Sequence, residues 1–306
     1  MDVAVGSELG IWQRQNDDAH LSESIAPNVA FFGVADGFGA LGRGVPTASL
    51  ALGAVRDYLR RRQRLGAFGP RGASPGGVRA MLLAALDHAN ARLYAHSGSH
   101  EDFVACGTSL TAVLVIGHHA FVGHVGDARA YLLRLGRLDP LTTDDALFTD
   151  AVPSAKAQLG ARHRSRSLLW RSLGTQPKLE ASIAHVELLA GDQLVLCTDG
   201  VHRCLGTDEI ADALVGSDSA SEVLARVFGL TRMRGNLDNA TLIVARDLLA
   251  PAALGAPVRA RPAGALRLTA ALAMLVALAA FLALTVYRSS TVDTVPQAQT
   301  TAADRR

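Results

Sequence analysis

A series of short apolar runs constrains the fold of this chain more than any other feature of its sequence. Each run has the length of one β-strand and is bounded by glycine or short polar residues. The six clearest runs are 28–35, 110–116, 120–125, 130–134, 193–197 and 241–245. Very short connections, around Gly117 and at Gly126 and Asp127, separate the second, third and fourth runs. Because such connections join antiparallel strands, we expect two hairpins and antiparallel sheets.

Helical periodicity appears between the first and second runs and again after the fifth. Apolar residues recur three and four positions apart over 50–59 and 78–93, on either side of a Gly/Pro-rich loop at 66–77. A third helical stretch, 208–232, contains Ser219 followed three residues later by glutamate, the spacing of a capping box. Together with the hairpins, these patterns predict an α+β fold, an antiparallel β-sandwich flanked by helices on both outer faces.

Composition excludes several classes of protein. The 306 residues are 49% hydrophobic and carry a net charge of +2, which allows a sizeable core and argues against a surface that wraps nucleic acid. Cys106, Cys197 and Cys204 lack the spacing of a disulfide framework or a zinc site and fit a reducing compartment. Residues 1–10 lack the basic and apolar regions of a secretory signal.

The C-terminal part contains an uncharged apolar stretch of membrane-spanning length. The twenty residues 268–287 are rich in Leu, Ala and Val, and as a helix they would cover about 30 Å, the hydrocarbon thickness of a bilayer. Arg267 and Arg288 bracket this stretch. No amphipathic pattern supports the alternative of a buried helix. We therefore expect a transmembrane helix.

The chain thus divides into four predicted parts. They are a domain at 1–247, a Pro/Ala/Arg-rich linker at 248–265, a transmembrane helix at 266–288 and a short polar tail at 289–306. Three arginines precede the span and three follow it, so the positive-inside rule does not set its orientation. A large folded domain without a secretory signal should stay in the cytoplasm. The expected location is the inner (cytoplasmic) membrane, with one span.

Four aspartates adjoin the strand-like runs: Asp36, Asp127, Asp199 and Asp238. Taken one at a time, each is typical of a turn, because aspartate is depleted within strands. Carboxylates gathered at one rim of a sandwich would repel one another unless cations neutralised them. Hard divalent ions such as Mg²⁺ and Mn²⁺ prefer oxygen ligands. The pattern therefore indicates a metal site.

Six short motifs, in order, resemble those of the metal-dependent protein phosphatase 2C family, in its bacterial Ser/Thr phosphatase form. They are RQNDDA at 14–19, VADGFG at 34–39, CGTSL at 106–110, VGDAR at 125–129, CTDGV at 197–201 and DNAT at 238–241. Any one of them is weak, but six in the family's order are specific, and they cover nearly all of residues 1–247.

The resemblance implies a set of ligands for two Mn²⁺ or Mg²⁺ ions. Asp36 would bridge the ions, and Asp199 and Asp238 would complete the first. Gly37 would offer its backbone carbonyl to the second. The metals would lower the pKa of a shared water, which would attack phosphorus while they clamp the phosphoryl oxygens. No protein nucleophile is needed, so the lack of a Cys-x5-Arg loop is expected.

Three further aspartates complete the implied site. Asp17 and Asp18 match the acidic pair of the first motif, whose first member acts through a metal-bound water. Asp127, together with Asp199, would hold the weaker third ion of bacterial members. Asp17 stands where the family usually has glutamate, and its shorter side chain would lengthen that water bridge.

The first motif departs from the family in its arginine. The phosphate-binding arginine usually lies three residues before the asparagine, a position that Gln13 occupies here, while Arg14 comes one residue later. On a strand, a shift of one residue turns the side chain to the opposite face. Arg14 is therefore a candidate phosphate contact, and a surface arginine is the equal alternative.

Two other positions differ from relatives. Phe38 stands where eukaryotic members often carry a histidine that acts as general acid, which leaves protonation of the leaving group to water. Asp145 replaces the histidine of a Leu-Thr-x-Asp-His motif. The segment that follows, up to Ser172, would be a variable flap. Its basic stretch, 162–166, either meets an acidic or phosphorylated substrate or is simply an exposed loop.

The expected function is hydrolysis of phosphoserine and phosphothreonine on proteins, in opposition to a bacterial Ser/Thr kinase. The expected partners are phosphorylated proteins, that kinase with its substrates, and the membrane, with no nucleic acid. One alternative is a membrane-tethered pseudophosphatase that only binds partners. Another is hydrolysis of a different phosphoester, such as a nucleotide, although the chain lacks a Walker-type loop.

Overall fold

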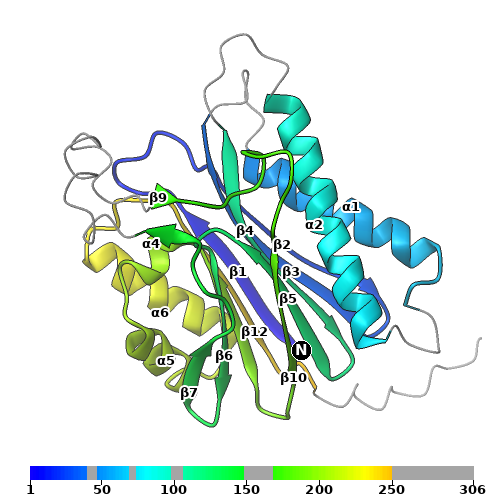
Figure 1. Ribbon diagram of the computed structural model, residues 1–306. Coiled ribbons are helices and arrows are strands. Elements are labelled where there is room, and N and C mark those ends of the chain that lie inside the picture. Colours follow the sequence, from blue (N-terminus) through cyan, green and yellow to red (C-terminus); the bar gives the residue numbers. More distant parts are fainter. Residues whose placement is uncertain (40–46, 69–73, 98–105, 148–167, 250–306) are drawn as a thin grey trace, which may run out of the picture. The chain divides into compact units, whose positions relative to one another are not determined.

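The computed structural model describes residues 1–39, 47–68, 74–97, 106–147 and 168–249, which belong to one compact unit, Met1–Ala250. Two five-stranded sheets form its centre (Figure 1). The first contains, in spatial order, β1 (Asp2–Glu8), β12 (Ala240–Arg246), β11 (Gln193–Cys197), β6 (Arg129–Arg134) and β7 (Arg137–Pro140). The second contains β10 (Ser182–Glu187), β5 (His119–Val125), β4 (Gly107–Ile116), β3 (Val29–Phe38) and β2 (Asp18–Ala26). All neighbouring strands are antiparallel.

Helices cover the outer face of each sheet (Figure 1). The second sheet carries α1 (Thr47–Arg64) and α2 (Pro75–Ser97). The first sheet carries α5 (Thr207–Val215), α6 (Ala220–Met233) and the one-turn helix α4 (Asp199–His202). A small two-stranded sheet pairs β8 (Ala146–Leu147) with β9 (Leu168–Leu169). The predicted α+β sandwich with helices on both outer faces is therefore confirmed.

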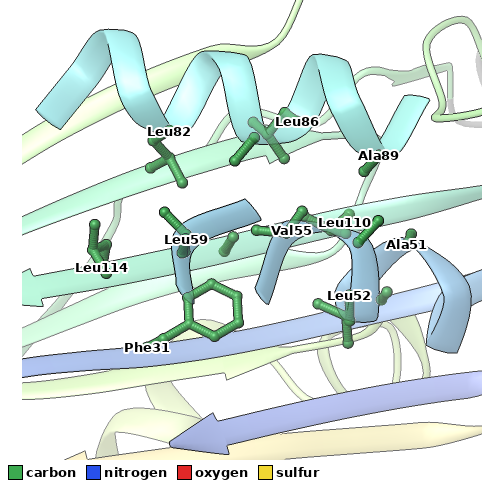
Figure 2. Packing of buried hydrophobic residues seen from close by; sticks show 14 of the residues in the cluster. Phe31, Ala51, Leu52, Val55, Leu59, Leu82, Leu86, Ala89, Leu110 and Leu114 are labelled. Atoms are coloured by element: carbon green, nitrogen blue, oxygen red, sulfur yellow. The ribbon is translucent and has the colours of Figure 1, made fainter. Parts of the chain in front are cut away.

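Three hydrophobic layers hold these elements together, and β3 shows why. Its side chains alternate between faces, so Phe31 packs among α1 and α2 while Phe32 packs between the two sheets. Figure 2 shows the first of these layers, where Leu52 and Leu59 of α1 lie together with Leu82 of α2 and Phe31. An inner strand that is buried on both faces needs a continuous apolar run.

One predicted hairpin is wrong. The strands on either side of Gly126 and Asp127, β5 and β6, belong to different sheets, so these residues carry the chain from one sheet to the other. Gly126 has a φ of +100°, and a Cβ at this position would lie 2.5 Å from the Cβ of Ser109. Glycine permits both the left-handed backbone and the close contact. The crossing places Asp127 at the end of the sandwich.

The third helical stretch is two helices rather than one. The chain breaks between α5 and α6, and Ser219 caps the second helix by accepting a hydrogen bond from the backbone N–H of Glu222 at 3.1 Å. The carboxylate of Glu222 accepts from the backbone N–H of Asp218 at 2.9 Å instead of from that of Ser219. The predicted cap is confirmed, with the return bond shifted by one residue.

No helix among the described residues is long and apolar enough to cross a membrane. The predicted transmembrane helix at 266–288, the tail at 289–306 and the basic stretch at 162–166 lie outside the described residues, as does all but the first two residues of the predicted linker.

Candidate active site

The strands bring five of the predicted aspartates to one end of the sandwich. Asp18 begins β2 and lies opposite Asp36 at the end of the β2–β3 ladder, and β3 itself continues two residues beyond Asp36. Asp199 lies two residues after β11 and begins α4, Asp127 lies two residues before β6, and Asp238 lies two residues before β12. Because adjoining strands run antiparallel, the end of one meets the start of the next at the same edge. Figure 1 shows α4 at this edge.

Asp18 joins the two sheets. Its Oδ2 accepts hydrogen bonds from the hydroxyls of Thr198 and Thr241, at 2.8 and 2.7 Å, while its buried Oδ1 has no hydrogen-bond partner. Burial raises the pKa of Asp18 to about 6, and the two threonine bonds offset only part of that effect. The carboxyl group is thus fixed in place but lacks a neutralising cation among the described residues.

Asp36 lies at the centre of the acidic group. Burial raises its pKa well above the ordinary value, and the charges of Asp18, Asp199, Asp238 and Asp127, in decreasing order, raise it further. Its backbone carbonyl accepts a hydrogen bond from the Thr108 hydroxyl at 2.8 Å. The surrounding carboxylates therefore make the charged form of Asp36 costly unless a cation is near.

Glycine at position 37 is required by close packing against the start of α1. A Cβ there would lie 2.6 Å from the Thr47 hydroxyl and 3.0 Å from the backbone oxygen of Asp17. The N–H of Gly37 donates to that same oxygen at 3.2 Å. The backbone next to Asp36 is therefore free of side-chain bulk.

One arginine serves two of the carboxylates. Nη2 of Arg203 lies 3.2 Å from Oδ2 of Asp199 and 3.5 Å from Oδ2 of Asp127. Burial raises the pKa of Asp199 well above its ordinary value even though Arg203 acts in the opposite direction. Oδ1 of Asp199 is buried without a hydrogen-bond partner. Sequence reasoning missed Arg203, although its spacing of four residues from Asp199 is the signal of a helical ion pair.

Asp238 is oriented by two donors on one oxygen. Nε2 of Gln13 donates to Oδ1 at 2.5 Å, and the backbone N–H of Asn239 donates to the same atom at 2.9 Å. Both bonds fall on Oδ1, so Oδ2 is available for another ligand. Gln13, the residue at the family's arginine position, is thus a part of the site that the sequence did not predict.

The remaining predicted residues lie in the loop before β2, where the strand-face argument for Arg14 does not apply. Arg14 is exposed and makes no hydrogen bond or ion pair with any other described residue. Oδ1 of Asp17 accepts from Nε2 of Gln15 at 2.6 Å. Asn16 shapes the loop, since its Oδ1 accepts from the N–H of Asp18 at 3.1 Å and its Nδ2 donates to Ser7.

The donor set fits hard divalent cations. It consists of carboxylates, two of which have a buried oxygen without a hydrogen bond, and their mutual repulsion favours a positive ion. Within the described ranges, no three His, Cys, Asp or Glu side chains come close enough together to hold one ion. Such a set suits Mg²⁺ or Mn²⁺, since these ions often take one or two carboxylates and keep several waters.

Two antiparallel sheets between layers of helices, with carboxylates gathered at one end, define an α+β sandwich suited to metal-dependent hydrolysis. Residues 12–243 match the family model described as Protein phosphatase 2C. The chain belongs to the protein phosphatase 2C family.

Relatives of the chain carry consistent names. The serine/threonine protein phosphatase PstP of Mycobacterium tuberculosis is 30% identical over 245 residues, which are 79% of this chain and 44% of PstP. The serine/threonine phosphatase stp of Listeria welshimeri is 26% identical over 219 residues, 71% of this chain and 84% of stp. The chain thus spans less than half the length of PstP.

A solved structure of the PstP catalytic domain in complex with two manganese ions is similar in fold. It has a TM-score of 0.63 and 27% identity, and the match covers 80% of this chain and 96% of that one.

Proposed function

We propose that the chain is a metal-dependent protein serine/threonine phosphatase that hydrolyses phosphoserine and phosphothreonine. The observation that carries this proposal is the group of carboxylates around Asp36, left without enough cations by the described residues, in a protein phosphatase 2C fold. The two manganese ions of the PstP catalytic domain support it.

In this proposal Asp36, Asp199, Asp238 and the backbone carbonyl of Gly37 would hold two Mn²⁺ or Mg²⁺ ions, and Asp17 would act through a metal-bound water. No three acidic side chains among the described residues lie close enough together to hold one ion by themselves, so water would supply the remaining ligands. When bound, the ions supply an activated water and neutralise the phosphoryl oxygens during in-line attack. Asp18 lies beside them, and Asp127, with Asp199, would hold the weaker third ion.

The chain's own side chains orient these ligands. Gln13 fixes Oδ1 of Asp238 and leaves Oδ2 without a bond from this donor. Thr198 and Thr241 hold Asp18 between the sheets, and Arg203 offsets part of the charge of Asp199. Hydrogen bonds from neighbouring side chains to metal ligands keep carboxylates in one geometry.

Two further positions concern the substrate, namely the contact to its phosphate and the protonation of its leaving group. Arg14 is the proposed phosphate contact, since it follows Gln13 in the chain, is exposed and has no competing ion pair among the described residues. Phe38 occupies the position where a histidine would act as general acid, so we assign protonation of the leaving alkoxide to water.

The direct experiment measures phosphate release from a phosphothreonine peptide by the full chain. We expect turnover with Mn²⁺, loss of turnover on chelation, and loss in Asp36→Ala. A chain that hydrolyses no phosphoester with any divalent ion contradicts the proposal and favours the pseudophosphatase, whose partner binding would survive Asp36→Ala. Preferential hydrolysis of nucleotides over phosphopeptides would favour the alternative that the chain hydrolyses a different phosphoester.

We further propose that the chain opposes a Ser/Thr protein kinase at the inner (cytoplasmic) membrane, anchored by 266–288 with the catalytic domain in the cytoplasm. The uncharged run at 268–287 supports the anchor. Expressed in cells, the full chain should sediment with membranes after a carbonate wash, and a chain ending at residue 250 should not. Equal distribution of the two proteins would contradict the anchor.

A further inference from the structure

The loop between β1 and β2 exposes three large apolar side chains within four residues. Leu9, Ile11 and Trp12 are 52%, 67% and 63% exposed. Single exposed apolar residues need no explanation, but a group that includes tryptophan indicates a contact surface. Tryptophan is also among the residues most enriched where proteins bind each other.

Backbone hydrogen bonds hold this loop in one conformation. The N–H of Ile11 donates to the carbonyl of Asn236 at 3.0 Å, and the N–H of Gln13 donates to the carbonyl of Gly10 at 3.0 Å. The N–H of Gly10 donates to Oδ1 of Asn239 at 3.2 Å. The polar backbone thus faces the connection between α6 and β12, while the apolar side chains are left in solvent.

The same loop borders the acidic site. A Cβ on Gly10 would lie 2.4 Å from the carbonyl carbon of Asp238, so the loop backbone packs directly on this aspartate. Gln13 donates to the carboxylate of Asp238, and Arg14, which is exposed and has no ion pair with another described residue, follows in the chain. Figure 1 shows the loop in dark blue at the end of the sandwich that carries α4. The apolar side chains and the exposed Arg14 therefore belong to a loop that packs against Asp238.

We propose that Leu9, Ile11 and Trp12 form a docking surface for the phosphorylated segment of the protein substrate, which contributes a large apolar side chain next to its phosphoresidue. This inference rests on the proposed function. A segment whose phosphate reaches Asp36 must cross the neighbouring surface, and this loop is continuous with the site. Arg14 matches the negative charge of the phosphate, and the apolar side chains bury the flanking residue.

A second group of exposed apolar residues provides a control. Leu135, Leu189 and Val215 lie around a cavity at the opposite ends of β6 and β11. Asp127 and Asp199 adjoin the other ends of these strands. Leu135 is fully exposed and belongs to the turn between β6 and β7, so its truncation tests a solvent-exposed apolar residue far from the site.

The kinetic test uses the full chain with Mn²⁺ and two phosphothreonine peptides that differ only in having leucine or serine on both sides of the phosphoresidue. Trp12→Ala should lower kcat/KM for the leucine peptide about thirtyfold, the size of an interface hot spot. The serine peptide and p-nitrophenyl phosphate should be little affected, and Leu135→Ala should change none of the three. An equal loss on all substrates, or no loss on the leucine peptide, overturns the docking surface.

Fluorescence separates docking from catalysis, because Trp12 and Trp170 are the two tryptophans of the chain. In the full chain carrying Trp170→Phe and Asp36→Asn, the leucine peptide should shift Trp12 emission to the blue and saturate, and the serine peptide should have little effect. Hydrolysis of the peptide by the unaltered chain without a Trp12 response overturns docking and leaves the proposed function standing. A Trp12 response without hydrolysis under any divalent ion does the reverse, and failure of both overturns both.

Discussion

Buried aspartates are treated differently in two regions of this molecule. Asp145, which is 2% exposed, binds both the guanidinium of Arg171 and the N–H of Gly126. Asp192 is equally buried and accepts two hydrogen bonds from Arg134, at 3.0 Å and 2.6 Å. Each of these carboxylates has its own arginine, which is what a buried charge requires.

The acidic rim consists of the aspartates gathered at one end of the sandwich, Asp18, Asp36, Asp127, Asp199 and Asp238. There the described residues supply fewer arginines. Asp18 and Asp36 have no arginine beside them, and Asp127 and Asp199 share Arg203. The fold therefore neutralises buried carboxylates with arginine where they serve structure. It leaves those at the rim to a mobile cation, which is the physical basis of the proposed metal dependence.

Neutralising the centre of the rim is the largest perturbation. Asp36→Asn should reduce phosphopeptide hydrolysis by about a thousandfold or more, because the bridged ions contribute several kcal/mol to the transition state and each 1.36 kcal/mol is a factor of ten. Initial rates at saturating Mn²⁺ measure this effect. Retained activity would remove the distinction between the two regions.

Substitution of an aspartate that is paired with arginine should instead change the stability of the fold. Asp145→Ala should lower the free energy of unfolding by about 2 kcal/mol. This loss is smaller than that for a fully buried ion pair, because Arg171 is partly hydrated. Asp36→Asn, compared in the same metal-free buffer, should leave stability unchanged or increase it, because it removes repulsion. Urea unfolding in chelator gives both values, and greater destabilisation by the rim substitution would reverse the comparison.

The stability of the metal-free protein should also depend on pH, because the aspartates of the rim titrate. Burial raises the pKa of Asp18 from 3.8 to about 6 in the folded state, so this group favours folding below about pH 4 and loses that contribution as pH rises through 6. Stability should therefore fall between pH 4 and 7, by at most about 1.4 kcal/mol per pH unit for this group.

Asp18→Asn isolates that contribution, since an amide oxygen can still accept from Thr198 and Thr241. Its metal-free unfolding free energy should vary less with pH over the same interval than that of the unaltered chain. Parallel pH profiles for the two proteins would show that Asp18 titrates normally.

Gln13 allows a smaller and finer test. Gln13→Ala should weaken Mn²⁺ binding about tenfold, because Asp238 loses a hydrogen bond that orients it. Gln176→Ala is the matched control, since its side chain is exposed and makes no hydrogen bond to an aspartate among the described residues. Equal affinity in both variants, measured by calorimetry, would show that Asn239 alone orients Asp238.

The part of the fold that sequence predicts follows from burial. All six predicted strands are inner strands, covered by helices on one face and by the other sheet on the opposite face. Besides the short β8 and β9, four described strands escaped prediction, and these four, β1, β2, β7 and β10, are the edges of the two five-stranded sheets. In β2 and β10, exposed residues alternate with half-buried ones over most of the strand. No continuous apolar run therefore marks these strands in the sequence.

The candidate site, like the fold, was predicted only in part. Aspartates next to glycine were visible as motifs, but their supporting contacts were not, because these join residues far apart in the chain. Gln13 and Asp238 are 225 positions apart, and Asp18 and Thr198 are 180 apart. The crossing at Gly126 was also hidden, since a short connection between strands is normally a hairpin.

Calorimetric titration of Mn²⁺ into the full chain tests the central claim most directly. The account predicts saturable binding of two ions, with loss of binding in Asp36→Asn and none in Asp192→Asn, whose carboxylate belongs to the arginine-paired region. Absence of Mn²⁺ binding to the unaltered chain, or equal binding by Asp36→Asn, would contradict it.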